Sequence, residues 1–327
     1  FVAVYGILWF LLQKQFALLR KHHFYDVYYA GTIMIGVVSF LAYLALDDVR
    51  LRIGLLAVAF LTLLVGIVDE QMKLTARTQF VWQVVIAFIA VSWGWTVRYV
   101  SNPFDTGVFN LDLYSLGTLA LPGAILAVAW LLFLVNAINW LDGADGLASG
   151  IGVIALITVA LVSLLPSTQD SQTLTLALIG AGAVLGFLLW NFPPAKVYLG
   201  TTGSWFLGLY IGMIAIVGGG KIVTTLLVLA LPVIDVLYVI VQRAMAGQAP
   251  WQGDTVHHLH HRLLAQGIKP PVLTFIAIGI SIVLGIAAIT LQTQQKIAAF
   301  IVAACMLALL VVSLMYASKR RNTIYEK

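Results

Sequence analysis

Four polar side chains stand close together directly after a long apolar run of the sequence. They are Asn136, Asn139, Asp142 and Asp145, and the apolar residues 119–135 precede them. An ionisable group near hydrocarbon is costly unless it meets a partner, an ion or water. Asn136, Asn139 and Asp142 recur every third residue, so a continuing helix would present them on one face. A polar helix cap would account for one of the four, so we interpret the cluster as a functional site.

An acidic pair, Asp69 and Glu70, ends the apolar stretch 53–68 and is followed by Lys73. Paired carboxylates can hold a divalent cation, or one can act as a base whose pKa the other raises. A solvated helix end explains the pair equally well. The other acidic pair, Asp47–Asp48, lies among arginines, and we interpret it as such a solvated loop.

A third polar segment, residues 190–204, contains two prolines that stop a helix and a run of small and hydroxyl residues after them. Its glycines and hydroxyls suit a turn whose N–H groups bind phosphate at the start of the next helix. Lys196 adds a positive charge, and Tyr198 offers a face on which a base can stack. An ordinary loop is an equally good interpretation of this segment taken alone.

The fourth segment, residues 246–270, places four histidines in five positions, His257, His258, His260 and His261, between Asp254 and Arg262. Imidazole is a common ligand of zinc, so zinc binding is one interpretation. The segment has no cysteine, however, and the carboxylates elsewhere in the sequence suit a hard cation such as Mg²⁺ better. We interpret the segment as a basic, hydrogen-bonding clamp for a pyrophosphate, with an incidental solvated loop as the alternative.

The composition places these segments in a helical membrane protein. The chain is 61% hydrophobic and 9% charged, and its mean hydropathy is +1.01. Because a span needs about 20 apolar residues, we expect an all-α, polytopic fold with eleven spans in a single domain, residues 1–327. The predicted spans are 1–18, 29–46, 53–68, 80–98, 117–138, 150–165, 173–190, 203–218, 222–241, 271–292 and 297–317. No cleavage-site pattern follows the first, which is therefore expected to be a membrane helix and not a signal peptide.

Cations divide unequally between the two sides of this topology, with twelve on one side and five on the other. The twelve are Arg20, Lys21, Lys73, Arg77, Lys196, Arg243, Arg262, Lys269, Lys319, Arg320, Arg321 and Lys327. The positive-inside rule makes that side cytoplasmic, with the N-terminus outside and the C-terminus inside. All four polar segments and all six histidines fall on it. The sequence therefore predicts one active face at the cytoplasmic surface.

Taken in order, the motifs resemble those of the polyprenyl-phosphate N-acetylhexosamine-1-phosphate transferases. They are Asp69-Glu70, N-x-x-N-x-x-D-G-x-D-G over residues 136–146, the segment 191–204, and H-x-H-H-R ending at Arg262. The resemblance covers about residues 53–270. With Asp235 and Arg243 upstream, the histidine segment looks more like that of the undecaprenyl-phosphate GlcNAc-1-phosphate transferases than that of phospho-MurNAc-pentapeptide translocase.

This resemblance implies a transfer of sugar-1-phosphate from a UDP-N-acetylhexosamine to undecaprenyl phosphate, or another polyprenyl phosphate, with release of UMP. Such a reaction is the first membrane step of cell-envelope polysaccharide synthesis in the bacterial cytoplasmic membrane. The implied cofactor is Mg²⁺, with Mn²⁺ as the alternative. The implied partners are the two substrates and membrane lipid. A homodimer is compatible with the resemblance, although the sequence identifies no interface, and no nucleic-acid partner is expected.

The resemblance also implies roles for individual residues. Those expected in catalysis are Asp69, Glu70, Asp142, Asp145, His260 and His261. Those expected to bind substrate are Lys73, Asn136, Asn139, Asn191, Lys196, Tyr198, Gly200, Gly203, Ser204, Asp254, His257, His258 and Arg262. Metal binding is expected at Asp142 and at position 201.

Three departures from the family's pattern bear on these expectations. Thr201 stands where the family carries an aspartate that binds Mg²⁺, and a neutral hydroxyl is a poorer ligand for that ion. Glu70 replaces a second aspartate, and the family's basic N-terminal pattern is only partly present at residues 20–23.

Two hypotheses follow from the departure at Thr201. One is a transferase with altered metal coordination. The other is a catalytically impaired homologue that binds lipid phosphate or UDP-sugar as a sensor, scaffold or transport factor. An unrelated transporter is disfavoured, because the polar segments gather at one face instead of the bilayer midplane.

Overall fold

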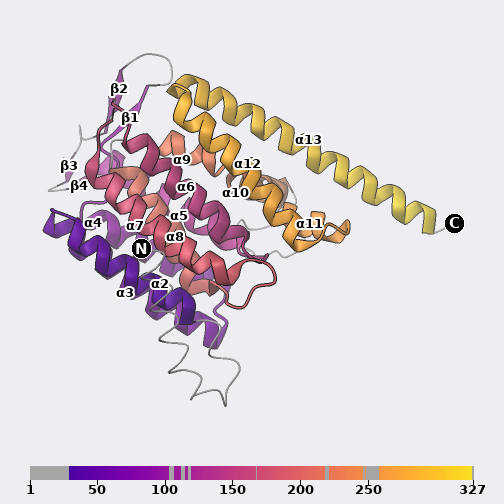
Figure 1. The fold of residues 1–327 in the computed structure, drawn as a ribbon, viewed down its shortest axis with the longest axis horizontal. Coiled ribbons are helices and arrows are strands. Elements are labelled where there is room, and N and C mark those ends of the chain that lie inside the picture. The colour runs from indigo at the N-terminus through magenta and orange to yellow at the C-terminus, as the bar shows by residue number, and fades with distance from the viewer. Residues whose placement is uncertain are drawn as a thin grey trace.

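The computed structural model describes residues 29–102, 107–111, 115–116, 119–166, 168–217, 221–245, 247 and 258–325, and within them the chain forms twelve helices (Figure 1). These are α2 (Tyr29–Ala45), α3 (Val49–Met72), α4 (Ala76–Ser92), α5 (Leu121–Leu141), α6 (Leu147–Ser163), α7 (Ser171–Asn191), α8 (Gly200–Val217), α9 (Ile222–Val228), α10 (Ala230–Met245), α11 (Leu259–Ala265), α12 (Pro270–Thr290) and α13 (Thr293–Tyr325). The predicted all-α class is confirmed.

The apolar helices account for every predicted span that falls on described residues. Six are long and apolar enough to cross a membrane, namely α3, α5, α7, α8, α12 and the first part of α13. The bent pair α9–α10 would make a seventh, and α2, α4 and α6 are shorter apolar helices. The chain is therefore a multi-pass membrane protein. The span predicted at residues 1–18 lies outside the described residues.

One predicted span is not a single helix. Residues 222–241 were expected to cross the membrane in one piece, but α9 and α10 meet at 85° with a break at Leu229. Pro232 in the first turn of α10 has no backbone N–H, so it cannot continue the helical hydrogen-bond ladder to the carbonyl of Val228. A proline is tolerated there because the first turn of a helix needs no such bond. The bend sends α10 across the bundle instead of along it.

Two short hairpins precede α5, and the second of them includes residues 119–120, which were expected to be helical as part of the span 117–138. The strands β1 (Tyr99–Ser101) and β2 (Val108–Asn110) pair antiparallel, as do β3 (Ser115–Leu116) and β4 (Leu119–Ala120). Pro122 occupies the first turn of α5, where its fixed backbone angle suits a helix start. The helix therefore begins later than its apolar sequence suggested.

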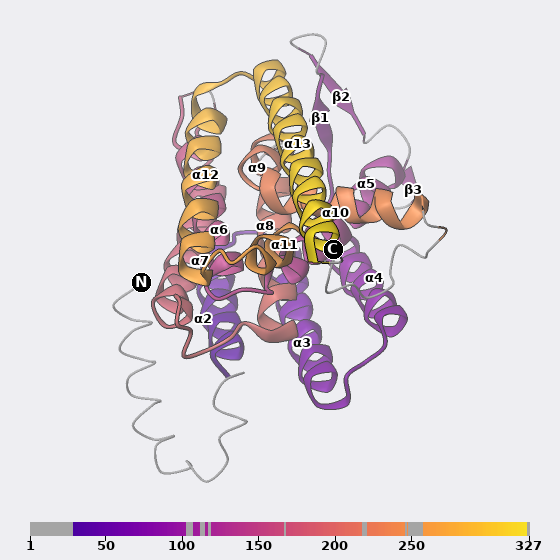
Figure 2. The same ribbon diagram turned by 90° about the vertical axis from the view of Figure 1, so that its right-hand side faces the viewer.

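Helix α8 forms the centre of the bundle. Buried residues make up 83% of it, and it contacts α2, α3, α5, α6, α7 and α9. The approach of α3 is close, because a Cβ on Gly66 would collide with Thr202 at the start of α8. Helices α12 and α13 lie at the outside of the bundle, and α13 extends beyond it toward the C-terminus (Figures 1 and 2).

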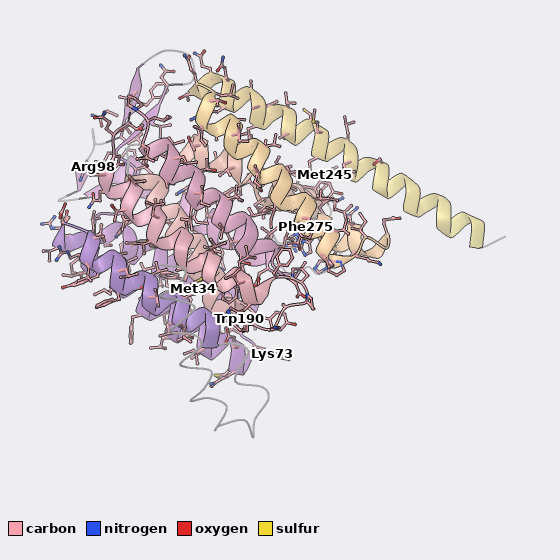
Figure 3. All side chains as sticks on the ribbon, in the orientation of Figure 1. Met34, Lys73, Arg98, Trp190, Met245 and Phe275 are labelled. Carbon is pink, nitrogen blue, oxygen red and sulfur yellow. The ribbon has the colours of Figure 1, made fainter. Side chains whose placement is uncertain are left out.

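Helix directions bring the polar segments to one end of this bundle. Helices α3, α5 and α7 end there and α8 begins there, and Figure 3 shows Lys73 and Trp190 at this end with Arg98 at the other. The opposite end holds the Asp47–Asp48 pair, which is exposed as expected, and Asp48 caps α3 by accepting a 2.7 Å hydrogen bond from Arg50 N.

Candidate active site

The carboxylate of Asp69 joins three helices at the site. It is 6% exposed. Its Oδ1 accepts hydrogen bonds from Gln79 Nε2 at 2.8 Å and from Leu74 N at 3.1 Å. Its Oδ2 accepts a 2.6 Å bond from Thr201 Oγ1. This acid, which was expected to take part in catalysis, is therefore already bound by three protein donors, one of them the residue at the predicted metal position.

Glu70, the residue after Asp69, binds Thr202, the residue after Thr201 in α8. Its Oε1 accepts hydrogen bonds from Thr202 Oγ1 at 3.1 Å and Thr202 N at 3.4 Å. Lys73 caps α3 in the left-handed conformation, with φ of 51°, and its side chain is exposed. The two acids thus fasten the end of α3 to the start of α8.

The first turn of α8 has fewer free groups than the phosphate-binding prediction required. Thr202 N is taken by Glu70, and Gly203 N donates to Leu199 O at 3.0 Å. A Cβ on Gly203 would lie 3.3 Å from Cα of Gly31 in α2, so this glycine serves helix packing. Gly200 supplies the turn, with φ of +64°.

The two asparagines of α5 bind different neighbours. Asn136 Nδ2 donates to Gln83 Oε1 in α4 at 2.9 Å. Asn139 Oδ1 lies 2.9 Å from the hydroxyl of Ser204 in α8, which is fully buried. Asp142 lies one turn beyond Asn139, and Thr201 lies one turn before Ser204. The contact therefore brings the two predicted metal positions to neighbouring places at the end of the bundle.

Asp142 differs from the acids of α3 because its carboxylate accepts no hydrogen bond from any described residue. Burial, and then the charge of Asp145, raise the pKa of Asp142 well above its ordinary value. Such a carboxyl group favours a cation or a hydrogen-bond donor supplied by a ligand. Among the predicted catalytic acids, it is the one that the described part of the chain leaves most available.

Asp145 and Asn191 hold the loops of the site in place. Asp145 Oδ2 accepts a 2.9 Å hydrogen bond from Ala195 N. Buried Asn191 accepts from Ser149 Oγ at 2.6 Å and from Gly146 N at 3.1 Å, and it donates to Val197 O at 2.9 Å. Both residues were predicted to act on ligands, but the bonds described here link the loop after α5 to the loop after α7.

The histidine segment is anchored by Asp235 of α10. Its Oδ2 lies 2.8 Å from His258 Nδ1, and its Oδ1 accepts a 2.7 Å bond from Leu259 N, the first residue of α11. The ring of His258 packs against Trp140, with 5.1 Å between centroids. Asp235 was not predicted as a site residue, and the sequence signal that could have identified it is an acid within the apolar stretch 222–241.

His260 lies over the loop that carries Asp142. A Cβ at Gly143 would collide with Nε2 of His260, so only glycine allows this approach. The ring is 4% exposed, and neither of its nitrogens has a hydrogen-bond partner in the described residues. Burial, then the charge of His261, lower the pKa of His260 to about 4. At neutral pH this ring is therefore uncharged, and both of its nitrogens are buried without a hydrogen-bond partner among the described residues.

Several predicted binding residues lie at the rim of the site. Lys196 and Tyr198 are exposed, and Lys196 Nζ lies 5.3 Å from the centroid of the Trp190 ring. Arg262 stands over Tyr238, with Cζ 5.5 Å from the ring centroid, and His261 lies 4.1 Å from His260 by ring centroids. The predicted residues Asp254 and His257 lie outside the described residues.

Comparison with known proteins identifies the family of the chain. A model of glycosyl transferase family 4 matches residues 52–219, more than half of the chain. The "probable undecaprenyl-phosphate N-acetylglucosaminyl 1-phosphate transferase" of Bacillus subtilis is 35% identical over 241 residues, which cover 72% of this chain and 64% of that protein. The decaprenyl-phosphate N-acetylglucosaminephosphotransferase of Mycolicibacterium smegmatis is 32% identical over 232 residues, 63% of this chain and 55% of that protein.

The second branch named above is also represented. The phospho-N-acetylmuramoyl-pentapeptide-transferase of Shouchella clausii is 34% identical over 233 residues, 66% of this chain and 67% of that protein. The chain spans less than two thirds of the length of the two GlcNAc-phosphate transferases. The resemblance inferred from the four motifs is confirmed, and the chain belongs to glycosyl transferase family 4.

Proposed function

We propose that this chain transfers a sugar-1-phosphate from a UDP-N-acetylhexosamine to a polyprenyl phosphate, undecaprenyl phosphate being the acceptor we would test. One observation carries the proposal. Segments that are far apart in the sequence meet at one end of a membrane bundle, as in the contacts of Asp69 with Thr201, 132 positions apart, and of Asn139 with Ser204, 65 positions apart. The meeting place combines a carboxylate, imidazoles and cations. These groups suit a diphosphate, and the chain belongs to a family whose relatives carry transferase names.

In the proposed reaction, an oxygen of the acceptor phosphate bonds to the β-phosphorus of the UDP-sugar. The bond from that phosphorus to the oxygen bridging the α- and β-phosphates breaks, and UMP leaves with the electron pair. A phosphate monoester is largely ionised at neutral pH, so the site has little deprotonation to perform. Positioning and charge neutralisation then supply most of the acceleration.

We assign each residue a role in this reaction from its exposure and its hydrogen bonds. We assign His258, His260 and Arg262 to the diphosphate as hydrogen-bonding or charged groups. Tyr198, which is exposed, offers a surface for the uracil. Asp69 accepts three protein hydrogen bonds, so we assign it the task of holding the start of α8 and not that of a general base.

Mg²⁺ is the cofactor that we propose, shared between protein and substrate. Within the described residues no three acidic, histidine or cysteine side chains gather into a cage for a metal. A protein commonly holds Mg²⁺ through one or two carboxylates, with phosphates and water completing the shell. Asp142, whose carboxylate accepts no hydrogen bond from the described residues, fits this requirement. The ion would neutralise charge that develops on the diphosphate.

A second candidate function is favoured by one contact. Thr201 is neutral and stands where the family carries an acid. Its hydroxyl donates a 2.6 Å hydrogen bond to Oδ2 of Asp69. A homologue that binds lipid phosphate or UDP-sugar without turnover is compatible with this arrangement.

The deciding experiment measures UMP release by the purified protein with undecaprenyl phosphate and a panel of UDP-sugars, with and without Mg²⁺. The Thr201→Asp variant is assayed in parallel. Release by the unmodified protein supports the proposed transfer and identifies the sugar. UMP release by the variant alone supports an impaired transferase. No UMP release by either protein, with UDP-sugar binding retained, supports the binding function.

We further propose that the site faces the cytoplasm of a bacterial cell, with the N-terminus outside and the C-terminus inside. The cations Lys73, Lys196 and Lys269 all adjoin helix ends on the side of the site. A fluorescent protein fused to the C-terminus should fluoresce in cells, whereas a fused alkaline phosphatase should be inactive. The reverse pair of results would overturn this orientation.

A further inference from the structure

We propose that Asp235 is a positioning residue of the site, which fixes the ring of His258 and leaves its Nε2 for the substrate. The inference deepens the proposed transfer and rests on it for the identity of the substrate. Asp235 lies in α10 and is not among the residues predicted for the site, although it accompanied the histidine segment in the family resemblance.

Two hydrogen bonds carry the argument, and both end on one carboxylate. Asp235 meets His258 Nδ1 at 2.8 Å and Leu259 N at 2.7 Å. His258 and Asp235 are 2% and 6% exposed, so water competes little for either bond. The carboxylate therefore fixes both the ring of His258 and the backbone at the start of α11.

The chemistry of the pair determines the protonation of the ring. An ionised carboxylate only accepts hydrogen bonds, so the proton between the two residues belongs to Nδ1. In the neutral ring Nε2 is then the acceptor, and in the charged ring it is a donor. No described residue is hydrogen-bonded to Nε2. This atom is the one that His258 can offer to a substrate.

The neighbours of the pair connect the ring of His258 to the acidic loop. Trp140, two residues before Asp142, packs against His258, and the guanidinium of Arg243 lies 5.3 Å from the centroid of the Trp140 ring. His260 also stacks on His258, with 5.8 Å between ring centroids, and its Nε2 lies against Gly143. A shift of His258 would therefore be transmitted to His260 and to the loop that carries Asp142.

A double-mutant cycle tests whether Asp235 acts through His258. The variants are Asp235→Asn, His258→Gln and the double variant, each assayed for kcat and KM with UDP-GlcNAc and undecaprenyl phosphate. An asparagine accepts one of the two bonds but presents an NH₂ group to the other donor. Because the bonds to Asp235 involve a charged, buried group, we expect a loss of roughly 10–100-fold in kcat/KM for each single variant. The double variant should lose no more than the stronger single variant.

The control is Asp170→Asn, which removes another hydrogen-bonded carboxylate far from the site. Asp170 pairs with Lys221 at 2.7 Å at the opposite end of the bundle. This variant should change thermal stability but not kcat/KM. Additive losses for Asp235→Asn and His258→Gln, or an unchanged kcat/KM for Asp235→Asn, would overturn the proposal.

Nuclear magnetic resonance of ¹⁵N-histidine-labelled protein tests the positioning of His258 without requiring turnover. The chain has six histidines, so the spectrum is small, and His258→Gln assigns one of them. We expect a hydrogen-bonded Nδ1–H signal from His258 that Asp235→Asn shifts and Asp170→Asn leaves in place. A His258 signal that is the same with and without Asp235 overturns the positioning role. If the unmodified protein shows no turnover but the signal responds to Asp235, the transfer reaction fails and the positioning of His258 stands.

Discussion

Thr201 donates a hydrogen bond from its Oγ1 to Oδ2 of Asp69, over 2.6 Å and across 132 positions of sequence. The same carboxylate accepts from Gln79 and Leu74, so its hydrogen bonds reach the beginning of α4 as well as that of α8. The residue that departs from the family's metal-binding pattern is thus bound to the first acid of the site. Its substitution should change the electrostatics of both groups.

Replacing Thr201 by aspartate should make the stability of the protein depend on Mg²⁺. Two carboxylates would then meet where a hydroxyl now donates to one, and like charges at this distance repel. We expect a loss of about 1–3 kcal/mol in the presence of a chelator. An ion bound at 100 times its Kd would restore about 2.7 kcal/mol. The measurement is the melting temperature in detergent across an Mg²⁺ titration.

Thr201→Asn is the matched control for this titration, because it adds a polar group of similar size without charge. Its melting temperature should not respond to Mg²⁺. An equal response of the asparagine and aspartate variants would show that the ion binds elsewhere.

Asp142→Asn should reduce metal-dependent turnover without destabilising the fold. Since no described residue donates a hydrogen bond to this carboxylate, the substitution breaks none of the described contacts. Its pKa is raised by burial and by Asp145, so the loss of its charge removes a desolvation cost. Loss of a metal-directed group is expected to lower kcat/KM by roughly 10–100-fold. Steady-state UMP release and thermal melting measure the two effects separately.

Asp47→Asn provides the comparison, because Asp47 is exposed at the opposite end of α3. It should leave both quantities unchanged. Equal losses from the two substitutions would contradict the location of the site.

Gly143→Ala should displace His260 and impair the site. The added Cβ would collide with Nε2 of that histidine, and a displacement of about 1 Å can cost 10²-fold in rate. Gly279→Ala in α12 is the control, because a Cβ there meets nothing within 4 Å. We expect kcat to fall for the first variant alone. Equal kcat for Gly143→Ala and the unmodified protein would mean that His260 is free to move.

The lowered pKa of His260 predicts a loss of stability in acid. Its pKa falls from 6.5 to about 4 on folding. The unfolded chain therefore binds more protons than the folded one between these values, and stability falls as the pH drops from about 6.5 toward 4. Above this window the residue makes no pH-dependent contribution. His260→Phe should flatten the corresponding part of a plot of melting temperature against pH.

Comparing the two proteins in one pH series cancels the titration of other groups, including Asp142, whose raised pKa acts in the opposite direction. The melting temperature of His260→Phe minus that of the unmodified protein should increase from pH 7 to pH 4. A constant difference would contradict the lowered pKa.

The sequence by itself determined the class of the protein, the helices of the membrane bundle and the end at which the polar motifs lie. Apolar runs such as 121–141 specify a span by local composition, because every backbone group in hydrocarbon must be satisfied within its own helix. Counting the helices then places Asp69 and Asp142 at the same end. The bend at Leu229 was missed because its cause, Pro232, is tolerated both in a first turn and in a kinked helix.

Only the tertiary structure decided which of these polar groups serve each other and which remain for a ligand. The sequence predicts a functional role for both Asn191 and Asp142. In the structure, three protein groups form hydrogen bonds with the Asn191 side chain, whereas no described residue donates a hydrogen bond to the carboxylate of Asp142. Asp235 and His258 are likewise paired only once α10 has turned and α11 has packed beside it. The reason is physical: hydrophobicity is a property of a segment, whereas a hydrogen bond depends on the positions and angles of two groups that distant segments bring together.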